Sequence, residues 1–190
     1  MQHMLFSDPI KLNAIRYGEK EAVSFMEKRF TYHQFNSRIN QLGHALQHIG
    51  VKKGDKVAFM LMNCNQLFEI VFACSKIGAV FVPINSRFVG PEIQHVLDDS
   101  DSCVLIFDSR FSNEIIAISN KVRTTRHFIT VGDATDIGDF EYEAWISSFS
   151  NDEPIPSETL NELDRISILL MNCREVFKES YLNISCVRDI

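Results

Sequence analysis

Glycine is scarce in this chain, and more than a quarter of the chain has none. The sequence has 8 glycines in 190 residues, and the 52 residues that follow Gly138 contain no glycine. Two glycine-rich patterns that bind nucleotide phosphates, G-x-G-x-x-G and G-x-x-x-x-G-K-[ST], are both absent. The G-x-S-x-G turn that presents a catalytic serine is absent too. The residues by themselves therefore supply no phosphate-binding motif and no catalytic motif.

Further absences narrow the class of protein. The five cysteines form no C-x-x-C or Cys/His pair, so they support neither a zinc site nor a disulfide framework. No window approaches the roughly 18 to 20 apolar residues that span a bilayer. A formal net charge of −6 disfavours sequence-independent binding of nucleic acid, which needs a basic surface. The first residues, MQHMLFSDPIKL, lack the features of a secretory signal, so we expect a cytoplasmic protein.

The apolar residues begin with a hairpin and a long helix. Residues 22–32 read as two short strands around Glu27-Lys28, although the Asn-Gly turn signature is missing. Thr31 and Gln34 fit a capping box at the start of a helix, and Gly50 lies where that helix should end. The helix predicted between them has one apolar stripe, formed by Phe35, Ile39, Leu42, Leu46 and Ile49.

Strands and helices then alternate along the chain. Apolar runs at 57–62, 79–84, 103–108 and 127–132 are typical of strands covered on both faces. Helices are predicted between them, at 67–77, 90–97 and 113–122. This alternation, with short turns, predicts an α/β fold: a Rossmann-like, mostly parallel sheet with flanking helices. After Gly132 the pattern weakens, and residues 133–164 read as an acidic surface connection, with or without a short helix, that holds one aromatic patch, made of Phe140, Tyr142 and Trp145.

Two groups of residues could hold a metal ion, but each has a simpler interpretation. His44 and His48 are four residues apart on the long helix, a spacing that can place two imidazoles on one metal. They lie opposite the apolar stripe and lack the glutamate of H-E-x-x-H, so two solvated histidines are the preferred interpretation. A second group, Asp98, Asp99 and Asp101, offers oxygen ligands. It lacks the calcium-loop pattern, and a solvated loop is preferred there.

One polar group stands where α/β proteins bind ligands. Asn85, Ser86 and Arg87 follow directly after the strand at 79–84. Ligands of open α/β sheets bind outside the carboxyl ends of the strands. A strand-ending turn with a surface arginine is the favoured interpretation, and a direct role in a site is the alternative.

Four ordered motifs nevertheless resemble one enzyme family. They are RFTYHQF (29–35), IGVKKGDKVAFMLMN (49–63), FACSKIGAVFVPINSR (72–87) and PEIQHVLDDSDSCVLIFD (91–108). Together they are similar to the N-terminal region of the AMP-forming acyl-CoA synthetases, in the adenylate-forming superfamily. The resemblance extends over roughly residues 5 to 171, and K-x-G-A-V-x-V-P-I-N favours the acyl-CoA ligase branch.

The resemblance implies an activity and its cofactors. Such enzymes use ATP and magnesium to convert a carboxylic acid into an acyl-adenylate, and the thiol of CoA then attacks it. In the family, the phosphates are held by the backbone N–H groups of a loop that reads close to T-S-G-T-T-G-x-P-K-G. That loop follows a strand introduced by an acidic residue, and Asp164 with RISILLM matches this lead-in.

The match ends where the loop should begin, at about Asn172. The chain continues NCREVFKESYLNISCVRDI, without glycine, threonine or proline. We therefore interpret residues 1–171 as a partial AMP-binding subdomain and 172–190 as a divergent tail, which is either partly disordered or the product of a frameshift. The expected protein is an N-terminal fragment of a fatty-acid or related acid–CoA ligase that is inactive alone and needs no cofactor itself.

No residue of the chain matches a catalytic, cofactor-binding or metal-binding position of the family. The matching positions are interpreted as structural: Thr31, Tyr32, Gly54, Asp55, Gly78, Ala79, Pro83 and Asn85. Two alternatives to an enzyme fragment stay open. One is a non-catalytic module that pairs with itself or with a full-length synthetase through an uncovered sheet. The other is an unrelated flavodoxin-like ligand-binding domain.

Overall fold

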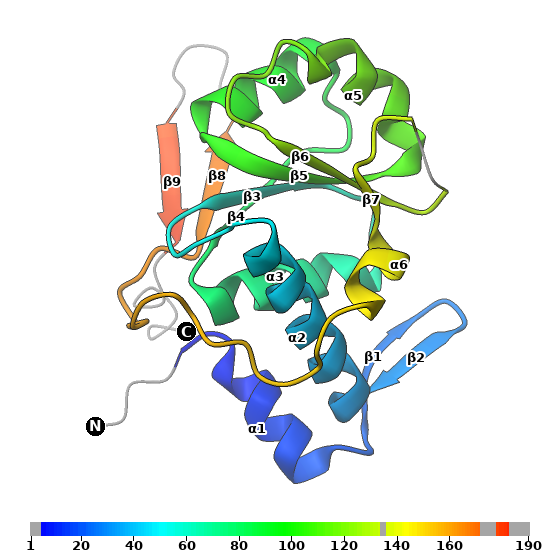
Figure 1. The fold of residues 1–190 in the computed structure, drawn as a ribbon, viewed down its shortest axis with the longest axis vertical. Coiled ribbons are helices and arrows are strands. Elements are labelled where there is room, and N and C mark those ends of the chain that lie inside the picture. The colour runs from blue at the N-terminus through cyan, green and yellow to red at the C-terminus, as the bar shows by residue number, and fades with distance from the viewer. Residues whose placement is uncertain (1–4, 134–135, 172–177, 183–190) are drawn as a thin grey trace.

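A seven-stranded sheet lies between two layers of helices (Figure 1). The computed structural model describes residues 5–133, 136–171 and 178–182. The strand order is β7-β6-β5-β3-β4-β8-β9, in which the first six strands are parallel and β9 runs antiparallel to β8. The strands are β3 (Lys56–Met60), β4 (Val80–Pro83), β5 (Ser102–Asp108), β6 (His127–Val131), β7 (Phe140–Glu141), β8 (Ser167–Met171) and β9 (Lys178–Leu182).

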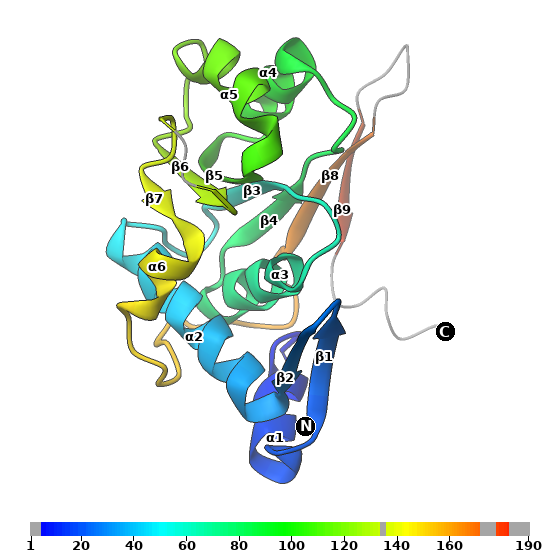
Figure 2. The same cartoon turned by 90° about the vertical axis from the view of Figure 1, so that its right-hand side faces the viewer.

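Helices cover both faces of the sheet. One layer holds α2 (Tyr32–His48), α3 (Asn65–Ile77) and α6 (Tyr142–Ser147), with α1 (Asp8–Tyr17) packed outside it. The other layer holds α4 (Gly90–Asp99) and α5 (Ser112–Ser119), which follow β4 and β5; the short 3-10 helix η1 (Ser109–Phe111) precedes α5. The hairpin of β1 (Glu21–Phe25) and β2 (Lys28–Thr31) stands beside α2 as a separate sheet (Figure 2). The predicted α/β fold class, with its parallel sheet and flanking helices, is confirmed.

The central strand β3 explains the near-continuous apolar runs. Val57 and Phe59 pack toward α2 and α3, whereas Ala58 and Met60 belong to the cluster under α4 and α5. All four side chains are buried. Because a strand in this position has helices on both faces, its residues need no polar alternation.

The long helix α2 follows the sequence pattern closely. The Thr31 side chain accepts a hydrogen bond from the Gln34 N–H, and the Gln34 side chain accepts one from the Thr31 N–H, which confirms the capping box. The predicted stripe is buried from Phe35 to Leu46. Gly50 and Gly78, which follow α2 and α3, have φ angles of 89° and 77°, values that glycine adopts without strain.

The segment after Gly132 is more buried than the sequence predicted. Tyr142 is fully buried in α6, and Trp145 is 7% exposed. Trp145 stacks on Phe140 with ring centroids 5.0 Å apart, and both residues belong to the core on the α2 and α3 side. The prediction of a surface connection is therefore wrong for these aromatic residues, because a short helix turns them onto α2.

Part of the predicted divergent tail has regular structure. Lys178–Leu182 form β9, with Met171 paired to Lys178 and Ser167 paired to Leu182. This strand lies within residues 172–190, whose interpretation as a divergent, partly disordered or frameshifted tail stays a prediction. Residues 172–177 and 183–190 lie outside the described residues, so the interpretation is not tested there.

Two glycines give a test of the packing at the ends of these elements. Both Gly54 and Gly78 have positive φ, so alanine at either site costs about 1 to 2 kcal/mol of backbone strain. A Cβ at Gly54 meets no atom within 4 Å, whereas at Gly78 it would lie 2.5 Å from Leu160 Cδ2. We expect Gly78→Ala to lower the free energy of unfolding by roughly 1 kcal/mol more than Gly54→Ala. Urea denaturation measures the difference, and equal losses would contradict it.

Candidate functional site

The carboxyl edge of the sheet is the first place to look for a site. The helix after β3 packs on one face of the sheet, and the helices after β4 and β5 pack on the other (Figure 1). This change of side around β3 is the topology that opens a ligand crevice in α/β proteins. The residues that follow the strands at this edge are Asn63 and Cys64 after β3, Asn85 to Arg87 after β4, and Ser109 and Arg110 after β5.

A cavity of about 380 Å³ lies at this edge, between β1 and the start of α3. Its lining residues are Val23, Ser24, Phe25, Asn63, Cys64, Asn65, Leu67 and Phe68. The Cys64 thiol is half-buried, and burial raises its pKa. Since the thiolate is the nucleophilic form of cysteine, this environment does not activate it. The cavity offers apolar contacts and a few amides but no group poised for acid–base or nucleophilic chemistry.

The polar group after β4 forms a turn. The Asn85 side-chain oxygen accepts a hydrogen bond from the Arg87 N–H at 3.0 Å, and the Asn85 carbonyl accepts one from the Phe88 N–H at 3.0 Å. Asn85 and Arg87 are exposed. This geometry agrees with the favoured interpretation, a strand-ending turn with a surface arginine.

The two histidines of α2 point to different partners. His44 Nε2 lies 3.0 Å from the Asp152 carbonyl oxygen, where it can donate a hydrogen bond. The His48 ring packs on Phe149, with centroids 5.3 Å apart. Within the described ranges, no three His, Cys, Asp or Glu side chains gather to hold a metal ion. Both histidines thus contact the segment after α6, while His48 stays exposed and His44 is partly exposed.

The acidic cluster lies at the end of α4: Asp98 and Asp99 are its last two residues, so the prediction of a solvated loop is wrong for them. The Asp98 carboxylate accepts a hydrogen bond from the Arg123 N–H at 2.8 Å and lies 3.5 Å from Arg123 Nε. Asp101 has a φ of 53° in the turn into β5. The contacts between Asp98 and Arg123 therefore join α4 to the segment before β6.

Two side chains with raised pKa values, Arg38 and Tyr142, contact the buried carboxylate of Glu69. Arg38 donates to both of its oxygens at 2.7 and 3.0 Å, Tyr142 donates at 2.8 Å, and the Asn65 amide donates at 2.7 Å. Burial and Glu69 raise the pKa of Tyr142. Burial alone would lower the pKa of Arg38, but hydrogen bonds and the charge of Glu69 outweigh it and raise that pKa.

This network is structural, although perturbed pKa values often mark active sites. Glu69 is fully buried and lines no cavity that we describe, and its oxygens are used by α2, α3 and α6 side chains. The sequence analysis missed it, because Glu69 stands beside the apolar stripe of α3. The signal was present only as a cluster of polar residues, Asn65, Gln66 and Glu69, on an otherwise apolar helix.

A second polar set fastens residues 149–164, which we call the strap, along α2 (Figures 1 and 2). Asn40 donates to the Asn151 carbonyl at 2.8 Å, and Gln47 donates to the Ile155 carbonyl at 2.7 Å. With His44 between them, these side chains form one polar stripe on the helix. The buried ammonium of Lys76 donates to both oxygens of Glu153, at 2.9 and 2.8 Å. The strap thereby crosses the helical layer and delivers the chain to β8.

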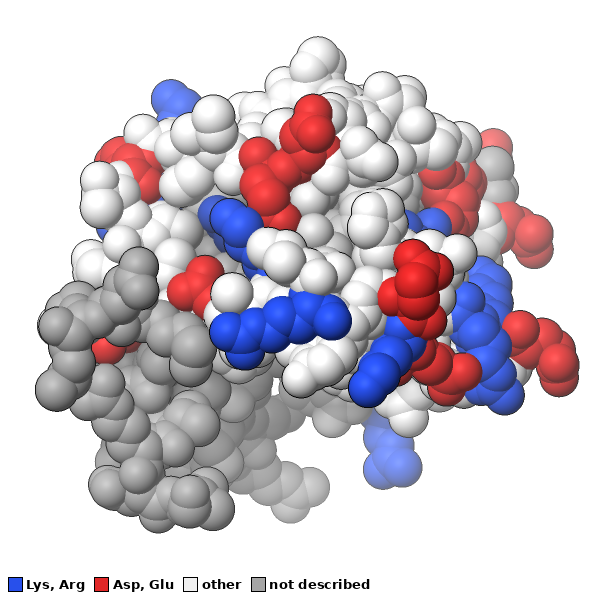
Figure 3. All heavy atoms as spheres, turned by 90° about the horizontal axis from the view of Figure 1, so that it is seen from below, with Lys and Arg blue, Asp and Glu red and all other residues white. Residues whose placement is uncertain are grey.

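Charges of both signs are mixed on the face that carries α1 and the hairpin. Figure 3 shows Lys and Arg side chains interspersed with Asp and Glu side chains on this face, without an extended field of one sign. Sequence-independent binding of nucleic acid needs an extended positive surface, and this face does not have one. Among the described residues, no helix is both long and apolar enough to cross a membrane.

Comparison with known families identifies the chain. The model of the family described as "AMP-binding enzyme" matches residues 10–169. The chain belongs to this family. The resemblance to adenylate-forming enzymes is confirmed, and the alternative of an unrelated flavodoxin-like domain is excluded.

Curated relatives of this AMP-binding family member are acyl-activating ligases. It is 29% identical over 150 residues to a 3-oxocholest-4-en-26-oate–CoA ligase of Rhodococcus rhodochrous, a match that covers 76% of this chain and 27% of the relative. It is 35% identical over 100 residues to a crotonobetaine/carnitine–CoA ligase of Salmonella typhi, covering 50% of this chain and 19% of that one. The chain thus spans about a quarter or less of the length of these relatives.

Solved structures show the same fold. An anthranilate CoA ligase, AuaEII, in complex with anthranoyl-AMP matches with a TM-score of 0.89 at 22% identity, over 97% of this chain and 35% of that one. A fatty acyl CoA synthetase of Mycobacterium tuberculosis matches with a TM-score of 0.84 at 25% identity, over 96% and 35%. The chain therefore has the architecture of one portion of these ligases.

The AMP-binding resemblance places the phosphate loop after β8, and the structure describes only its lead-in. Asp164, just before β8, accepts hydrogen bonds from Asn161 and pairs with Lys53, whose Nζ lies 2.9 Å from its Oδ2. The expected loop begins at about Asn172; residues 172–177 are outside the described residues, and Lys178–Leu182 form β9. Other matched positions form structural contacts: Thr31 caps α2, Asp55 accepts from the Lys52 N–H, and Gly78 packs under Leu160.

The Glu69 network predicts a large loss of stability on removal of one charge. Glu69→Gln leaves the mostly buried Arg38 with Glu143 as its remaining carboxylate, and weakening a buried pair in this way costs up to about 3 to 5 kcal/mol. The control Glu21→Gln removes a carboxylate that lies 3.7 Å from Arg29 and is about half exposed, so it should cost less than about 1 kcal/mol. Urea denaturation measures the free energy of unfolding of both variants. Similar losses would show that the Glu69 network stabilises the fold no more than an exposed ion pair does.

The strap predicts a loss of stability in acid. Burial alone would raise the pKa of Glu153, but hydrogen bonds from Lys76, Asn36 and Asn40 outweigh it, so the folded-state pKa is below its ordinary value. The stability that this carboxylate contributes is therefore complete above its unfolded-state pKa of about 4.3 and is lost as the pH falls through the lower folded-state value.

Unfolding in urea as a function of pH measures this contribution. The difference between wild type and Glu153→Gln should be largest near about pH 7 and should shrink below about pH 4, since both forms then carry an uncharged group. Glu21→Gln serves as the control for exposed carboxylates. A difference between wild type and Glu153→Gln that stays constant from neutral to acid pH would exclude the charge of Glu153 as its cause.

Proposed function

We propose that this chain is the N-terminal part of an ATP-dependent carboxylic acid–CoA ligase. The intact protein would adenylate an acid and then transfer the acyl group to the CoA thiol. The observation that carries the proposal is that 97% of the chain follows 35% of an acyl-CoA ligase structure with a TM-score of 0.89. The family model and the ligase relatives agree with it.

We further propose that the 190 residues do not adenylate an acid by themselves. Phosphates in such sites are held by closely spaced backbone N–H groups, which glycine-rich loops present best. The chain after Met171 has neither glycine nor threonine. The described carboxyl edge offers no carboxylate cluster for magnesium. These residues do not fit ATP, magnesium or CoA, so we derive no catalytic step from them.

A second proposal concerns partners. Leu163 is 67% exposed and Leu169 is 39% exposed, and both lie close to or within β8. Exposed apolar groups near a strand of the sheet favour pairing with another chain, either a second copy or a full-length synthetase. A cytoplasmic location fits this role and remains part of the proposal.

The first experiment is isothermal titration calorimetry of the chain with Mg·ATP, followed by a hydroxamate assay with a panel of carboxylic acids. We expect no heat of binding and no hydroxamate, because the sequence after Met171 lacks the glycine and threonine residues of a phosphate loop. The crotonobetaine/carnitine–CoA ligase of Salmonella typhi, assayed with its named substrates, is the positive control. Turnover by the chain alone would overturn the proposal of inactivity.

Sedimentation equilibrium over a range of concentrations tests the proposal of pairing. Self-association that weakens in Leu163→Ser would support pairing through this surface. A monomer at all concentrations that also fails to bind a full-length synthetase would exclude both partners.

A further inference from the structure

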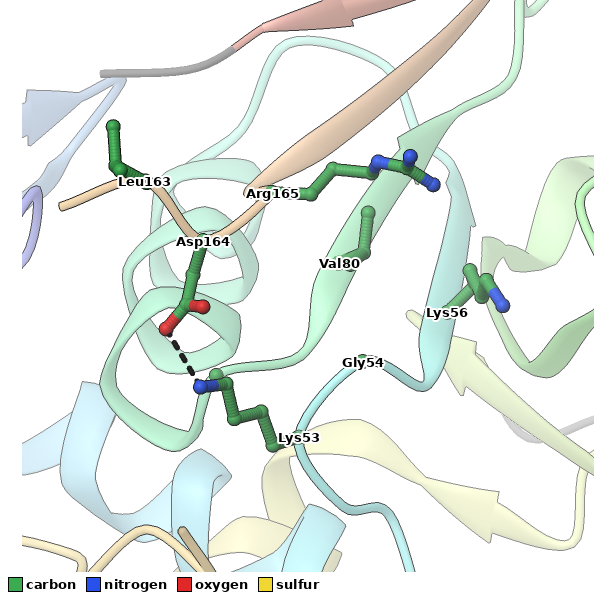
Figure 4. A pocket seen from close by; sticks show the side chains of 8 residues that line it. Lys53, Gly54, Lys56, Val80, Leu163, Asp164 and Arg165 are labelled. Atoms are coloured by element: carbon green, nitrogen blue, oxygen red, sulfur yellow. Dashed lines mark ion pairs between the residues drawn. The ribbon is translucent and has the colours of Figure 1, made fainter. Parts of the chain in front are cut away.

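Two cavities at opposite edges of the sheet differ in the chemistry of their walls. The cavity at the amino ends of β3 and β4, of about 450 Å³, is lined in part by charged side chains, and in it Lys53 Nζ lies 2.9 Å from Asp164 Oδ2 (Figure 4). The cavity of about 380 Å³ beside Cys64, at the carboxyl edge, has no Lys, Arg, His, Asp or Glu among the described residues that line it. A charge buried there would have no opposite charge in the walls to offset its desolvation, so this cavity suits an uncharged molecule.

The walls of the cavity beside Cys64 are mainly apolar side chains from two elements that the fold brings together. Val23 and Phe25 come from β1, and Leu67 and Phe68 come from the first turn of α3. Val23 and Leu67 also pack against the hydrophobic core, whereas Phe68 is 52% exposed. The cavity thus lies between the core and the solvent, and a ligand there would bury apolar surface of its own.

One polar group in the lining lacks a partner. Asn65 is 1% exposed, and its amide nitrogen donates to Glu69 Oε1 at 2.7 Å. Because an ionised carboxylate only accepts hydrogen bonds, the amide oxygen of Asn65 must face away from Glu69. This Oδ1 is buried and has no hydrogen-bond partner in the described part of the chain. A buried acceptor without a donor is costly, so a ligand that donates a hydrogen bond to it would remove that cost.

The start of α3 adds groups that donate hydrogen bonds. No side chain caps this helix, and its first turn contains no acidic residue. The N–H groups of a first helical turn have no partner within the helix. Here those of Gln66 and Leu67 interact with the half-buried Cys64 thiol, and sulfur is a weak acceptor. A hydroxyl group suits both features, since it donates one hydrogen bond and accepts others.

We propose that the cavity beside Cys64 binds a small neutral molecule with an apolar body and one hydroxyl group, such as a phenol. The hydroxyl would donate to Asn65 Oδ1 and accept from the first turn of α3, while the body lies against Phe25, Leu67 and Phe68. A carboxylate would be a poorer ligand, because it cannot donate to Asn65 and because the charge of Glu69 lies close by. The inference concerns the 190 residues themselves and does not rest on the ligase activity proposed above.

The test is isothermal titration calorimetry of the 190-residue chain with phenol. We expect one saturable site with a dissociation constant of about 1 mM, an affinity within reach of so small a ligand. Anisole has the same ring but cannot donate a hydrogen bond, so it should bind about fivefold more weakly. Benzoate, which carries a carboxylate instead of the hydroxyl, should also bind more weakly than phenol. Changing the ligand rather than Asn65 leaves the Glu69 network intact.

Two variants and a chemical label locate the site. Phe68→Ala removes part of the wall and should weaken phenol binding about fivefold. The matched control is Ile116→Ala, which removes an apolar side chain of similar exposure, 48%, from α5, outside the lining of this cavity. It should leave phenol binding unchanged. Phenol should also slow the alkylation of Cys64 by N-ethylmaleimide, measured by peptide mass spectrometry.

Several outcomes would overturn the proposal. Phenol that gives no saturable isotherm would exclude the site, and anisole that binds as tightly as phenol would exclude the hydrogen bond to Asn65. Benzoate that binds more tightly than phenol would assign the cavity to carboxylates. Binding that leaves the alkylation of Cys64 unchanged, or that Ile116→Ala weakens as much as Phe68→Ala does, would place phenol elsewhere on the chain. Urea denaturation of each variant verifies that it is folded.

Discussion

The buried carboxylate of Glu69 is the constraint on which the helical layer depends. An ionised carboxylate without partners is costly in a protein interior, so each of its oxygens must accept hydrogen bonds. Here the donors come from three helices, α2, α3 and α6, so the carboxylate is satisfied only when all three are in place. Apolar packing alone would allow these helices to slide, whereas a shared carboxylate fixes their relative position.

The same layer uses a second device of this kind. Asn40 and Gln47 hold carbonyl groups of the strap, and Lys76 holds its carboxylate at Glu153. Most loops run over the surface with their backbone groups in water. The strap instead forms a series of hydrogen bonds with side chains of α2. It then leads the chain into β8, which lies next to β4. Polar contacts on α2 and α3 thus guide the chain toward β8, whose own place is fixed by pairing with β4 and by the ion pair of Lys53 with Asp164.

How far the sequence alone could predict the structure depends on whether the signal was local. The capping box at Thr31, the buried stripe of α2 and the stop at Gly78 follow from neighbouring residues, and all were predictable. The burial of Tyr142 was not, because its environment is a carboxylate 73 residues away along the chain. The hydrogen bond of His44 could not be predicted for the same reason, because its partner, Asp152, is 108 positions away along the chain. For the candidate site, the sequence identified a turn at Asn85, but the cavity beside Cys64 is assembled from two separate segments, 23–25 and 63–68.

The strap also affects the order in which the chain folds. Its hydrogen bonds to α2 join residues between 108 and 117 positions apart in the chain. Contacts of such high sequence separation are closed late, because the chain entropy of the intervening loop must be lost first. During synthesis, α2 emerges with an uncompensated polar stripe and waits until the whole sheet up to β7 and the segment behind it has been made. Although α2 is synthesised early, it is thus among the last helices to complete its contacts.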